Sequence, residues 1–304
     1  MILNGIYIAL TVLAFLCQFC AFYVIVSGSP KNMQRYKTYL LIRTIYDLLL
    51  TSLMGVLLRI FPEDSRFVIS GLLSLMTGIY GVHFGVAVFF ALLVLIAAEK
   101  AICLVYRFLV FNKKRRKLFD QVFAKRNVLL IHLAVYFSAF FFGAFFSLTL
   151  SVNTDGASIY VQIEETNRLI PLILHSIFWT FTFSLLVYKV FVILKENENN
   201  YSNTTKRLHR QLTWLLLAQA ISPVILFLIP GVLAHFFWFV SHLIVLSLLT
   251  QMVINPILTI AFVSPYRRKL RNLTLGSCGK IRGRLIKVAD APNSMSIQSA
   301  TVTV

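Results

Sequence analysis

Apolar residues occur in long continuous runs along this chain, and short polar segments separate the runs. A helix needs about 20 apolar residues to cross roughly 30 Å of hydrocarbon. Because a chain in lipid must satisfy its backbone hydrogen bonds within each segment, continuous runs of this length predict transmembrane helices. The seven predicted spans are residues 3–27, 38–60, 76–98, 127–150, 169–194, 212–233 and 239–263.

The third predicted span has two possible placements. The chain is apolar from Phe67 to Ala98, which is a longer run than a bilayer requires. We expect this span to end on the inner side at Glu99 and Lys100, with 67–75 serving as an apolar outer connection. A strongly tilted or displaced helix is the alternative.

The first predicted span lies where a cleaved signal peptide would lie. No positively charged segment precedes it, however, its apolar run is longer than that of a signal peptide, and basic residues follow it. Its removal would leave both termini on the same side of the membrane. We therefore expect the span to be retained.

Composition supports a membrane protein. The chain is 58% hydrophobic with 27 Phe, and only 13% of its residues are charged. Its mean hydropathy is +0.80. This is more apolar surface than a soluble domain of 304 residues can bury. The net charge of +18 therefore suggests cytoplasmic loops that face anionic membrane lipids, and nucleic acid is not an expected partner.

The distribution of Lys and Arg predicts the orientation. With the N-terminus outside, 24 of the 29 basic residues lie in cytoplasmic segments and two, Arg66 and Arg168, lie in outer connections. This asymmetry predicts an all-α seven-transmembrane helix bundle with an extracellular N-terminus and a cytoplasmic C-terminus. Three Asn-x-Ser/Thr patterns then fall on the cytoplasmic side, and glycosylation at any of them would contradict the orientation. They begin at Asn200, Asn203 and Asn272.

The chain is expected to divide into a membrane domain and a tail. Residues 1–275 would form the seven-helix transmembrane domain, including a short basic helix beside the membrane, and 276–304 a disordered cytoplasmic tail. Cys278 in this tail is a candidate palmitoylation site. The outer connections contain no cysteine, so no disulfide is expected there.

Asp47 and Asn255 are polar residues at nearly the same predicted depth, in spans two and seven. An acid inside a membrane span suggests a function, and this pair could act as a conformational latch between the two spans. Arg43 lies one helical turn before Asp47, so a local ion pair is the alternative. The two arrangements can coexist.

Prolines within the last two spans suggest hinges. Pro223 and Pro230 lie in span six and Pro256 lies in span seven. Proline removes a backbone donor and clashes with the preceding turn, which kinks a helix. Proline is also common in membrane helices generally, so the sequence favours a hinge mainly in span six, which has two prolines.

The sequence provides no sign of an enzyme. Its histidines show no short metal-binding spacing, and no nucleophile elbow or phosphate-binding loop occurs. We therefore expect no catalytic residue, no metal site and no cofactor.

Two stretches resemble a known receptor superfamily. "LHRQLTWLLLAQAISPVILFLIP" (208–230) and "NPILTIAFVSPYRRKL" (255–270) are similar to spans six and seven of nematode serpentine chemoreceptors of the Str/Srh superfamily. The matching positions are Gln219, Pro223, Pro230, Pro265, Tyr266 and Arg267. The stretch "MQRYKTYLLIRTIYDLLL" entering span two is similar as well.

The chain also departs from related receptor patterns. It lacks the outer disulfide and the Asn-Pro-x-x-Tyr motif of rhodopsin-like receptors, since Thr259 stands at the tyrosine position. Only Glu99 and Lys100 represent the charged switch that follows span three in such receptors, and Arg107 comes two turns later.

The resemblance implies a G-protein-coupled chemosensory receptor, of an olfactory type, in the plasma membrane and in the cilia of sensory neurons. A small external molecule would bind it, and a heterotrimeric G protein would bind its basic cytoplasmic face. The expected ligand contacts are Tyr80, His83, Trp179, Phe227 and His242, and the expected G-protein contacts are Glu99, Lys100, Arg107 and Arg267. The expected conformational switch residues are Asp47, Asn255, Pro223 and Pro230. A channel-type chemoreceptor or a membrane carrier is the alternative.

Overall fold

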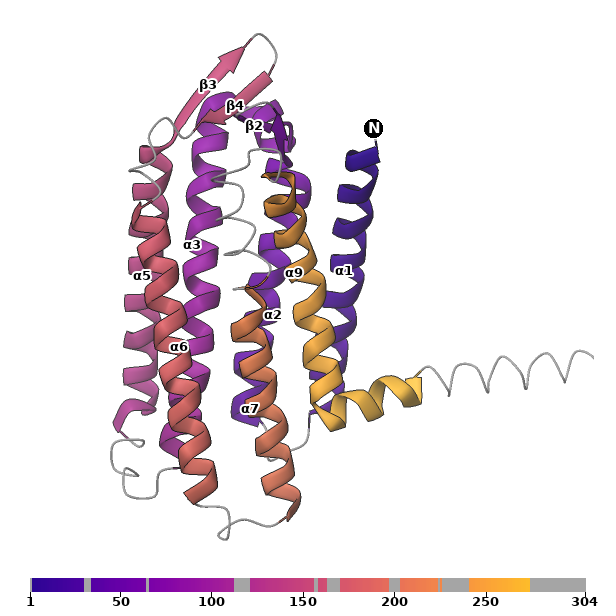
Figure 1. Ribbon diagram of the computed structural model, residues 1–304, viewed down its shortest axis with the longest axis vertical. Helices are drawn as coiled ribbons and strands as arrows, with labels where there is room; N and C mark the ends of the chain where they lie inside the picture. The colour runs from indigo at the N-terminus through magenta and orange to yellow at the C-terminus, as the bar shows by residue number, and fades with distance from the viewer. Residues whose placement is uncertain are drawn as a thin grey trace, which may run out of the picture.

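The computed structural model describes residues 2–29, 34–63, 66–111, 121–155, 158–162, 170–196, 203–223, 225 and 241–273. Long helices run side by side in one bundle, with a small sheet at one end (Figure 1). The helices are α1 (Ile2–Gly28), α2 (Gln34–Ser52), the π-helix η2 (Leu53–Leu58), α3 (Leu72–Phe111), α5 (Lys125–Thr149), α6 (Ile170–Glu196), α7 (Asn203–Pro223) and α9 (Ser241–Phe262).

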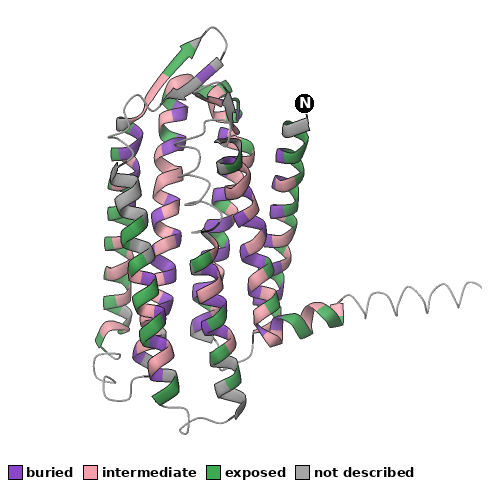
Figure 2. Ribbon diagram, in the orientation of Figure 1, coloured by how far each residue is buried: buried purple, intermediate pink, exposed green. Residues whose placement is uncertain are grey.

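The bundle has the surface of a membrane protein. Among the described residues, five helices are long and apolar enough to cross a membrane, and 181–193 of α6 is a shorter apolar stretch. Large apolar side chains point outward, such as Leu16 on α1 and Phe137 on α5, while the buried positions face neighbouring helices (Figure 2). Lipid tails would cover such a surface.

The observed helices correct the prediction for span three. α3 does not end at Glu99 and Lys100 but continues to Phe111, and these two residues are only 2% and 6% exposed. The prediction was wrong because buried partners on other helices hold both charges inside the bundle. The helix begins at Leu72, so most of the expected apolar connection precedes it and contributes to a strand.

The sheet was not predicted from the sequence. It contains β1 (Ile60–Glu63), β2 (Arg66–Ile69), β3 (Ser151–Asp155) and β4 (Ser158–Gln162), in the antiparallel order β1-β2-β4-β3. Ile69 pairs with Ile159, and both side chains are buried against the helices. The sheet therefore ties the α2–α3 connection to the α5–α6 connection by hydrogen bonds.

Two glycines in the helices are required by geometry. Gly143 on α5 packs directly on the backbone of Ala87, where any side chain would overlap the α3 carbonyl oxygen. Gly78 has a φ of 59° and marks a kink near the start of α3, in a region that only glycine adopts at little cost. Gly143 therefore permits the close packing of α5 on α3.

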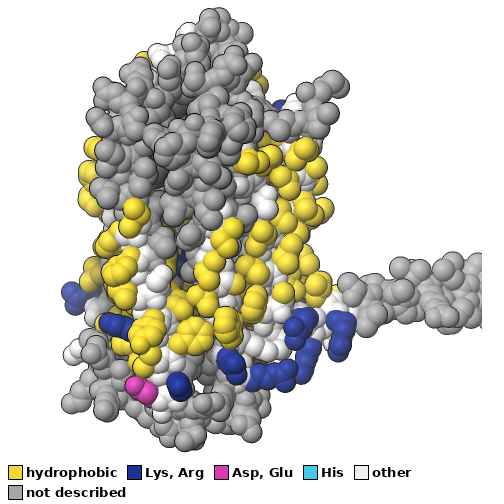
Figure 3. Space-filling view, in the orientation of Figure 1, with side chains coloured by type: hydrophobic (Ala, Val, Ile, Leu, Met, Phe, Trp, Pro, Cys, Tyr) yellow, Lys and Arg dark blue, Asp and Glu magenta, His cyan; other side chains and the backbone are white. Residues whose placement is uncertain are grey.

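The buried apolar residues form two clusters at different heights in the bundle. The first contains Leu50, Met54 and Leu249 near the sheet, and the second contains Leu104, Leu215 and Tyr266 near the opposite end. We call that opposite end the basic end. Its exposed cations on the described helices include Arg126, Lys195, Arg207, Arg210, Arg267, Arg268 and Arg271, and Figure 3 shows several of them below the apolar belt.

Candidate functional site

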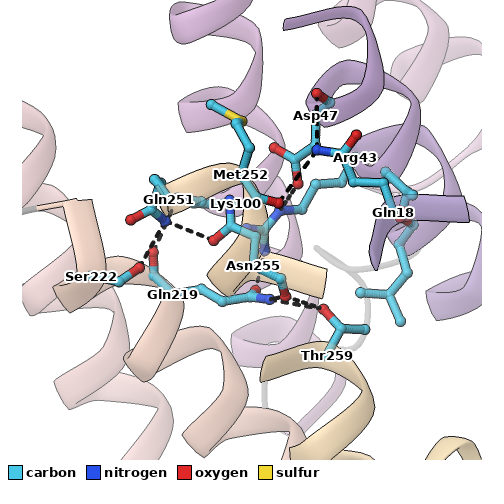
Figure 4. A network of polar contacts seen from close by, with 12 residues as sticks. Gln18, Arg43, Asp47, Lys100, Gln219, Ser222, Gln251, Met252, Asn255 and Thr259 are labelled. Carbon is cyan, nitrogen blue, oxygen red and sulfur yellow. Dashed lines mark hydrogen bonds and ion pairs between the residues drawn. The ribbon is translucent and has the colours of Figure 1, made fainter. Parts of the chain in front are cut away.

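A buried polar network lies between the two apolar clusters. It joins α1, α2, α3, α7 and α9 (Figure 4). Its members on α2 are Arg43 and Asp47, which form an ion pair with 3.9 Å between Nε and Oδ2. Both residues are at most 5% exposed, so the local pair expected from their spacing is present inside the bundle.

Asn255 on α9 lies next to this pair. Its side chain interacts with the carboxylate of Asp47, so α2 and α9 meet at this height. The amide of Gln251, one turn earlier, donates to the Asn255 side-chain oxygen at 2.7 Å and to the Ser222 hydroxyl at 2.8 Å. Asn255 thus connects the α2 ion pair to α9, and Gln251 extends the connection to Ser222 on α7.

Pro223 leaves a carbonyl group of α7 without its usual partner. In an α-helix the amide of residue 223 would donate to the carbonyl of Gln219, and proline has no amide hydrogen. Lys100 on α3 supplies the missing donor, with 3.0 Å between its Nζ and the Gln219 carbonyl oxygen. The residue that the sequence placed at the membrane surface therefore binds the carbonyl group that Pro223 leaves free.

Pro256 creates the same situation in α9. It frees the carbonyl of Met252, and Nε2 of Gln18 on α1 lies 3.4 Å from that oxygen. The same amide donates to the hydroxyl of Thr51 at 2.8 Å and approaches the carbonyl of Asp47 at 3.3 Å. Each of the two carbonyl groups that Pro223 and Pro256 leave free is thus bound by a side chain from another helix.

Gln219 has partners on three other helices in this network. Its side-chain oxygen accepts a hydrogen bond from the Arg43 guanidinium. Its Nε2 donates to the hydroxyl of Thr259 at 3.0 Å and lies 3.5 Å from the Asn255 carbonyl oxygen. Gln219 therefore links α2, α3, α7 and α9 through a single side chain and its own carbonyl group.

The network contains more basic than acidic side chains. Arg43 and Lys100 are the two basic groups, and Asp47 is the carboxyl group that faces them among the described residues. One guanidinium nitrogen of Arg43 and one oxygen of Asp47 have no hydrogen-bond partner in this part of the chain. Because buried polar atoms without a partner are costly, the packing of the surrounding helices must hold these groups in place.

A second polar cluster joins α2, α3 and α5. Glu99 on α3 lies 3.2 Å from Nε2 of His132 on α5, and the other ring nitrogen of His132 lies 2.7 Å from the Val128 carbonyl oxygen. The hydroxyl groups of Tyr46 and Tyr136 are 2.7 Å apart. Sequence reasoning did not identify this cluster, because no spacing in the chain relates Glu99 to His132.

The expected ligand contacts do not form one described site. Tyr80 is 87% exposed and faces outward from α3, which contradicts its expected place in a pocket. His83 is bound to Ser147 on α5, with Nδ1 at 3.1 Å from the carbonyl oxygen and 3.2 Å from the hydroxyl oxygen. Trp179 lies on α6 and His242 on α9, but their side chains lie outside the described residues, as does all of Phe227.

The expected G-protein contacts are also dispersed. The buried positions of Glu99 and Lys100 contradict a direct contact with a cytoplasmic partner. Arg107 lies on α3 with its side chain outside the described part, while Arg267 is exposed at the basic end and donates to the Ala261 carbonyl at 3.2 Å. Pro230 and Cys278 lie outside the described residues.

Part of the chain matches a known receptor family. Residues 156–272, from β4 to the segment after α9, match the family model "Serpentine type 7TM GPCR chemoreceptor Srd", which is a nematode serpentine receptor family. A search of curated proteins found no significant match. The match and the membrane-spanning helices together confirm the predicted seven-transmembrane helical fold and the resemblance to nematode serpentine chemoreceptors.

The membrane-spanning helices make the chain a multi-pass membrane protein, and its matched segment is similar to serpentine seven-transmembrane chemoreceptors. Within the matched segment lie Gln219 on α7 and Asn255 on α9, and Nε2 of Gln219 lies 3.5 Å from the Asn255 carbonyl oxygen. Gln18, on which one of the two proline kinks depends, had no sequence signal beyond being a polar residue in an apolar span.

Proposed function

We propose that this protein is a non-enzymatic receptor that binds a small external molecule and activates a heterotrimeric G protein. It would reside in the plasma membrane, including the cilia of sensory neurons, with its N-terminus outside. The family match supports the receptor class. The exposed cations at the basic end support a cytoplasmic placement of that end, since Lys and Arg concentrate on the cytoplasmic side of membrane proteins.

The observation that carries this proposal is the hydrogen bond from Lys100 to the Gln219 carbonyl beside Pro223. The bond fixes α7 to α3 at the carbonyl whose helical donor Pro223 removes. A ligand that favours a different arrangement of the helices would shift the population toward a state in which this bond is broken. The part of α7 between Pro223 and the basic end would then pivot.

The pivot would open the basic end to the G protein. Arg267 and Arg107 are the proposed contacts there, whereas Glu99 and Lys100 would act from inside the bundle. Asp47 and Asn255 would serve as the switch that senses the change, because they connect α2 to α9 at the same height as Gln219. The proposed ligand contacts are His83, Trp179, Phe227 and His242.

A ligand-gated channel or a carrier is the second candidate. The charge distribution opposes it, because an odorant channel of the insect type has a cytoplasmic N-terminus, whereas this charge asymmetry favours an external one. The two candidates differ in a simple observation: a receptor requires a G protein for its response, and a channel carries current without one.

The first experiment determines orientation and G-protein dependence together. Epitope tags at both termini are stained in intact and in permeabilised cells, and ligand-dependent nucleotide exchange is measured with a panel of heterotrimeric G proteins. We expect the N-terminal tag to be accessible in intact cells and the response to require a G protein. An inverted orientation, or a current that persists without any G protein, would overturn the proposal.

A proline variant then tests the hinge. Pro223→Ala restores an amide that can bond to the Gln219 carbonyl, so α7 should straighten and G-protein activation should fall several-fold at equal surface expression. The control is Ile221→Ala, on the same helix, at a side chain that is 45% exposed toward lipid. An undiminished response in Pro223→Ala would show that α7 does not pivot there.

A further inference from the structure

The segment after α9 is joined to α7 by paired hydrogen bonds. Residues 264–273 form a short helix, and its first residue, Ser264, faces Gln211 on α7. The Gln211 amide nitrogen donates to the Ser264 hydroxyl at 2.6 Å, and that hydroxyl donates back to the Gln211 oxygen at 2.9 Å. The backbone amide of Ser264 points to the same oxygen at 3.4 Å. We call this pair of residues the Gln211–Ser264 clasp.

The clasp serves as a helix cap that another helix supplies. The first amides of any helix lack intrahelical acceptors, and a side-chain oxygen normally provides one from the adjoining chain. Here the oxygen belongs to α7, about 18 Å along that helix from Pro223. A pivot of α7 at Pro223 would therefore remove the cap from the short helix, and fixing the short helix would resist the pivot.

Tyr266 attaches the short helix to α1. Its side chain is fully buried, and its hydroxyl lies 2.9 Å from the hydroxyl of Ser29. Because Ser29 donates its proton to the Ile25 carbonyl at 2.6 Å, Tyr266 is the donor between the two. Burial raises the pKa of the Tyr266 hydroxyl, which therefore keeps its proton for this bond. The short helix is thus held against α1 and α7 at the same time.

The outer face of the short helix carries positive charge. Arg268 and Arg271 are exposed, while Tyr266 is buried and Leu270 is half-buried. The helix turns sideways at the foot of α9 and points away from the bundle (Figure 1), at the border between the apolar belt and the basic residues (Figure 3). An amphipathic helix with this orientation and charge lies at the membrane surface and attracts anionic lipid.

We propose that anionic lipid headgroups bind Arg268 and Arg271 and, through the Gln211–Ser264 clasp, hold the first turns of α7 in the resting position. The binding surface and its link to α7 are properties of the protein without ligand or G protein. The consequence for signalling rests on the proposed function: anionic lipid would favour the inactive state.

The test is hydrogen exchange on the full-length protein in nanodiscs of phosphatidylcholine, with and without phosphatidylserine. In the native protein, we expect anionic lipid to slow exchange several-fold in 266–273 and also in 207–217. Arg268→Gln/Arg271→Gln should lose both effects. Gln211→Leu should lose the effect on 207–217 and keep the effect on 266–273. The charge-matched control is Arg126→Gln/Lys195→Gln, at exposed residues of the same end.

Each arm has an outcome that would overturn the proposal. Equal exchange of the native short helix in both bilayers would exclude an anionic lipid surface. If the Arg126→Gln/Lys195→Gln control lost the slowing of exchange equally, the effect would come from the general attraction of a basic protein to anionic lipid and not from the short helix. Slowing of 207–217 that survives Gln211→Leu would exclude the clasp as the connection. Since no G protein or ligand is present, these results are independent of the proposed signalling function.

Discussion

Gln18 on α1 donates a hydrogen bond to the carbonyl oxygen of Met252 on α9, the carbonyl that Pro256 leaves without its helical donor. Lys100 does the same for the carbonyl that Pro223 frees in α7. In the hydrocarbon core of a membrane, no water is present to donate a hydrogen bond to an unpaired carbonyl group. The two donors therefore make each kink dependent on a particular helix neighbour, so that the kinks and the helix packing can change only together.

Replacing Gln18 should weaken the contact between α1 and α9. Gln18→Leu leaves the Met252 carbonyl and the Thr51 hydroxyl without this donor, and interhelical hydrogen bonds in membranes contribute on average about 0.6 kcal/mol each. We expect the free energy of unfolding to fall by about 1–2 kcal/mol. Thermal unfolding of the purified protein measures this, with Leu16→Ala, at an exposed position of α1, as the control. An unchanged unfolding temperature in Gln18→Leu would mean that the Met252 carbonyl does not need this donor.

Replacing Lys100 should raise signalling without ligand. Lys100→Met keeps the length of the side chain and removes the donor to the Gln219 carbonyl, so α7 loses its bond to α3. A loss of about 1 kcal/mol shifts a two-state equilibrium roughly fivefold. We expect basal G-protein activation to rise by about this factor at equal surface expression.

The matched control for Lys100→Met is Lys195→Met, at an exposed lysine in the last turn of α6. It removes the same charge from the protein but none of the network. Basal activity that rises equally in both variants would assign the effect to total charge instead of the bond to α7.

Much of the fold follows from the sequence because each segment that crosses the lipid needs a continuous run of about 20 apolar residues. The predicted first span 3–27 and the observed α1, Ile2–Gly28, differ little, and span seven agrees as well with α9. The rule fails for α3, where Glu99 and Lys100 are charged but buried. Their partners, His132 and Gln219, lie on other helices, so no pattern in the sequence around Glu99 and Lys100 indicates these contacts.

Only part of the polar network could be predicted from the sequence. The depth of Asp47 and Asn255 and the spacing of Arg43 were readable from the chain, and the structure brings these three residues together. Gln219 stood out only as one of the positions that carry the family resemblance, with no role predicted for it, and Gln18 was not singled out at all. The strands were missed because β1 to β4 are four or five residues long and stand at the ends of apolar helices.

The charge balance of the network predicts the effect of neutralising Asp47. Asp47→Asn removes the carboxylate that faces Arg43 and Lys100, and breaking a buried ion pair from one side costs about 3–5 kcal/mol. We expect strongly reduced surface expression and a lower unfolding temperature. Arg43→Gln/Asp47→Asn removes one cation as well and should recover part of the loss. Asp47→Asn that is as stable as the native protein, or a double variant that is no better, would show that the ion pair is not needed for folding.

The contact of Gly143 with α3 predicts an unusual response to a single methyl group. In most helices Gly→Ala stabilises by about 0.5–1 kcal/mol, because alanine has less backbone freedom to lose. At Gly143 the new methyl group would overlap the carbonyl oxygen of Ala87, so α5 must move away from α3. We therefore expect Gly143→Ala to destabilise the protein by about 1–3 kcal/mol. Gly5→Ala is the control, because a methyl group at Gly5 meets nothing within 4 Å and should raise the unfolding temperature slightly. If both variants unfold at or above the native temperature, α3 and α5 do not pack as closely as the structure shows.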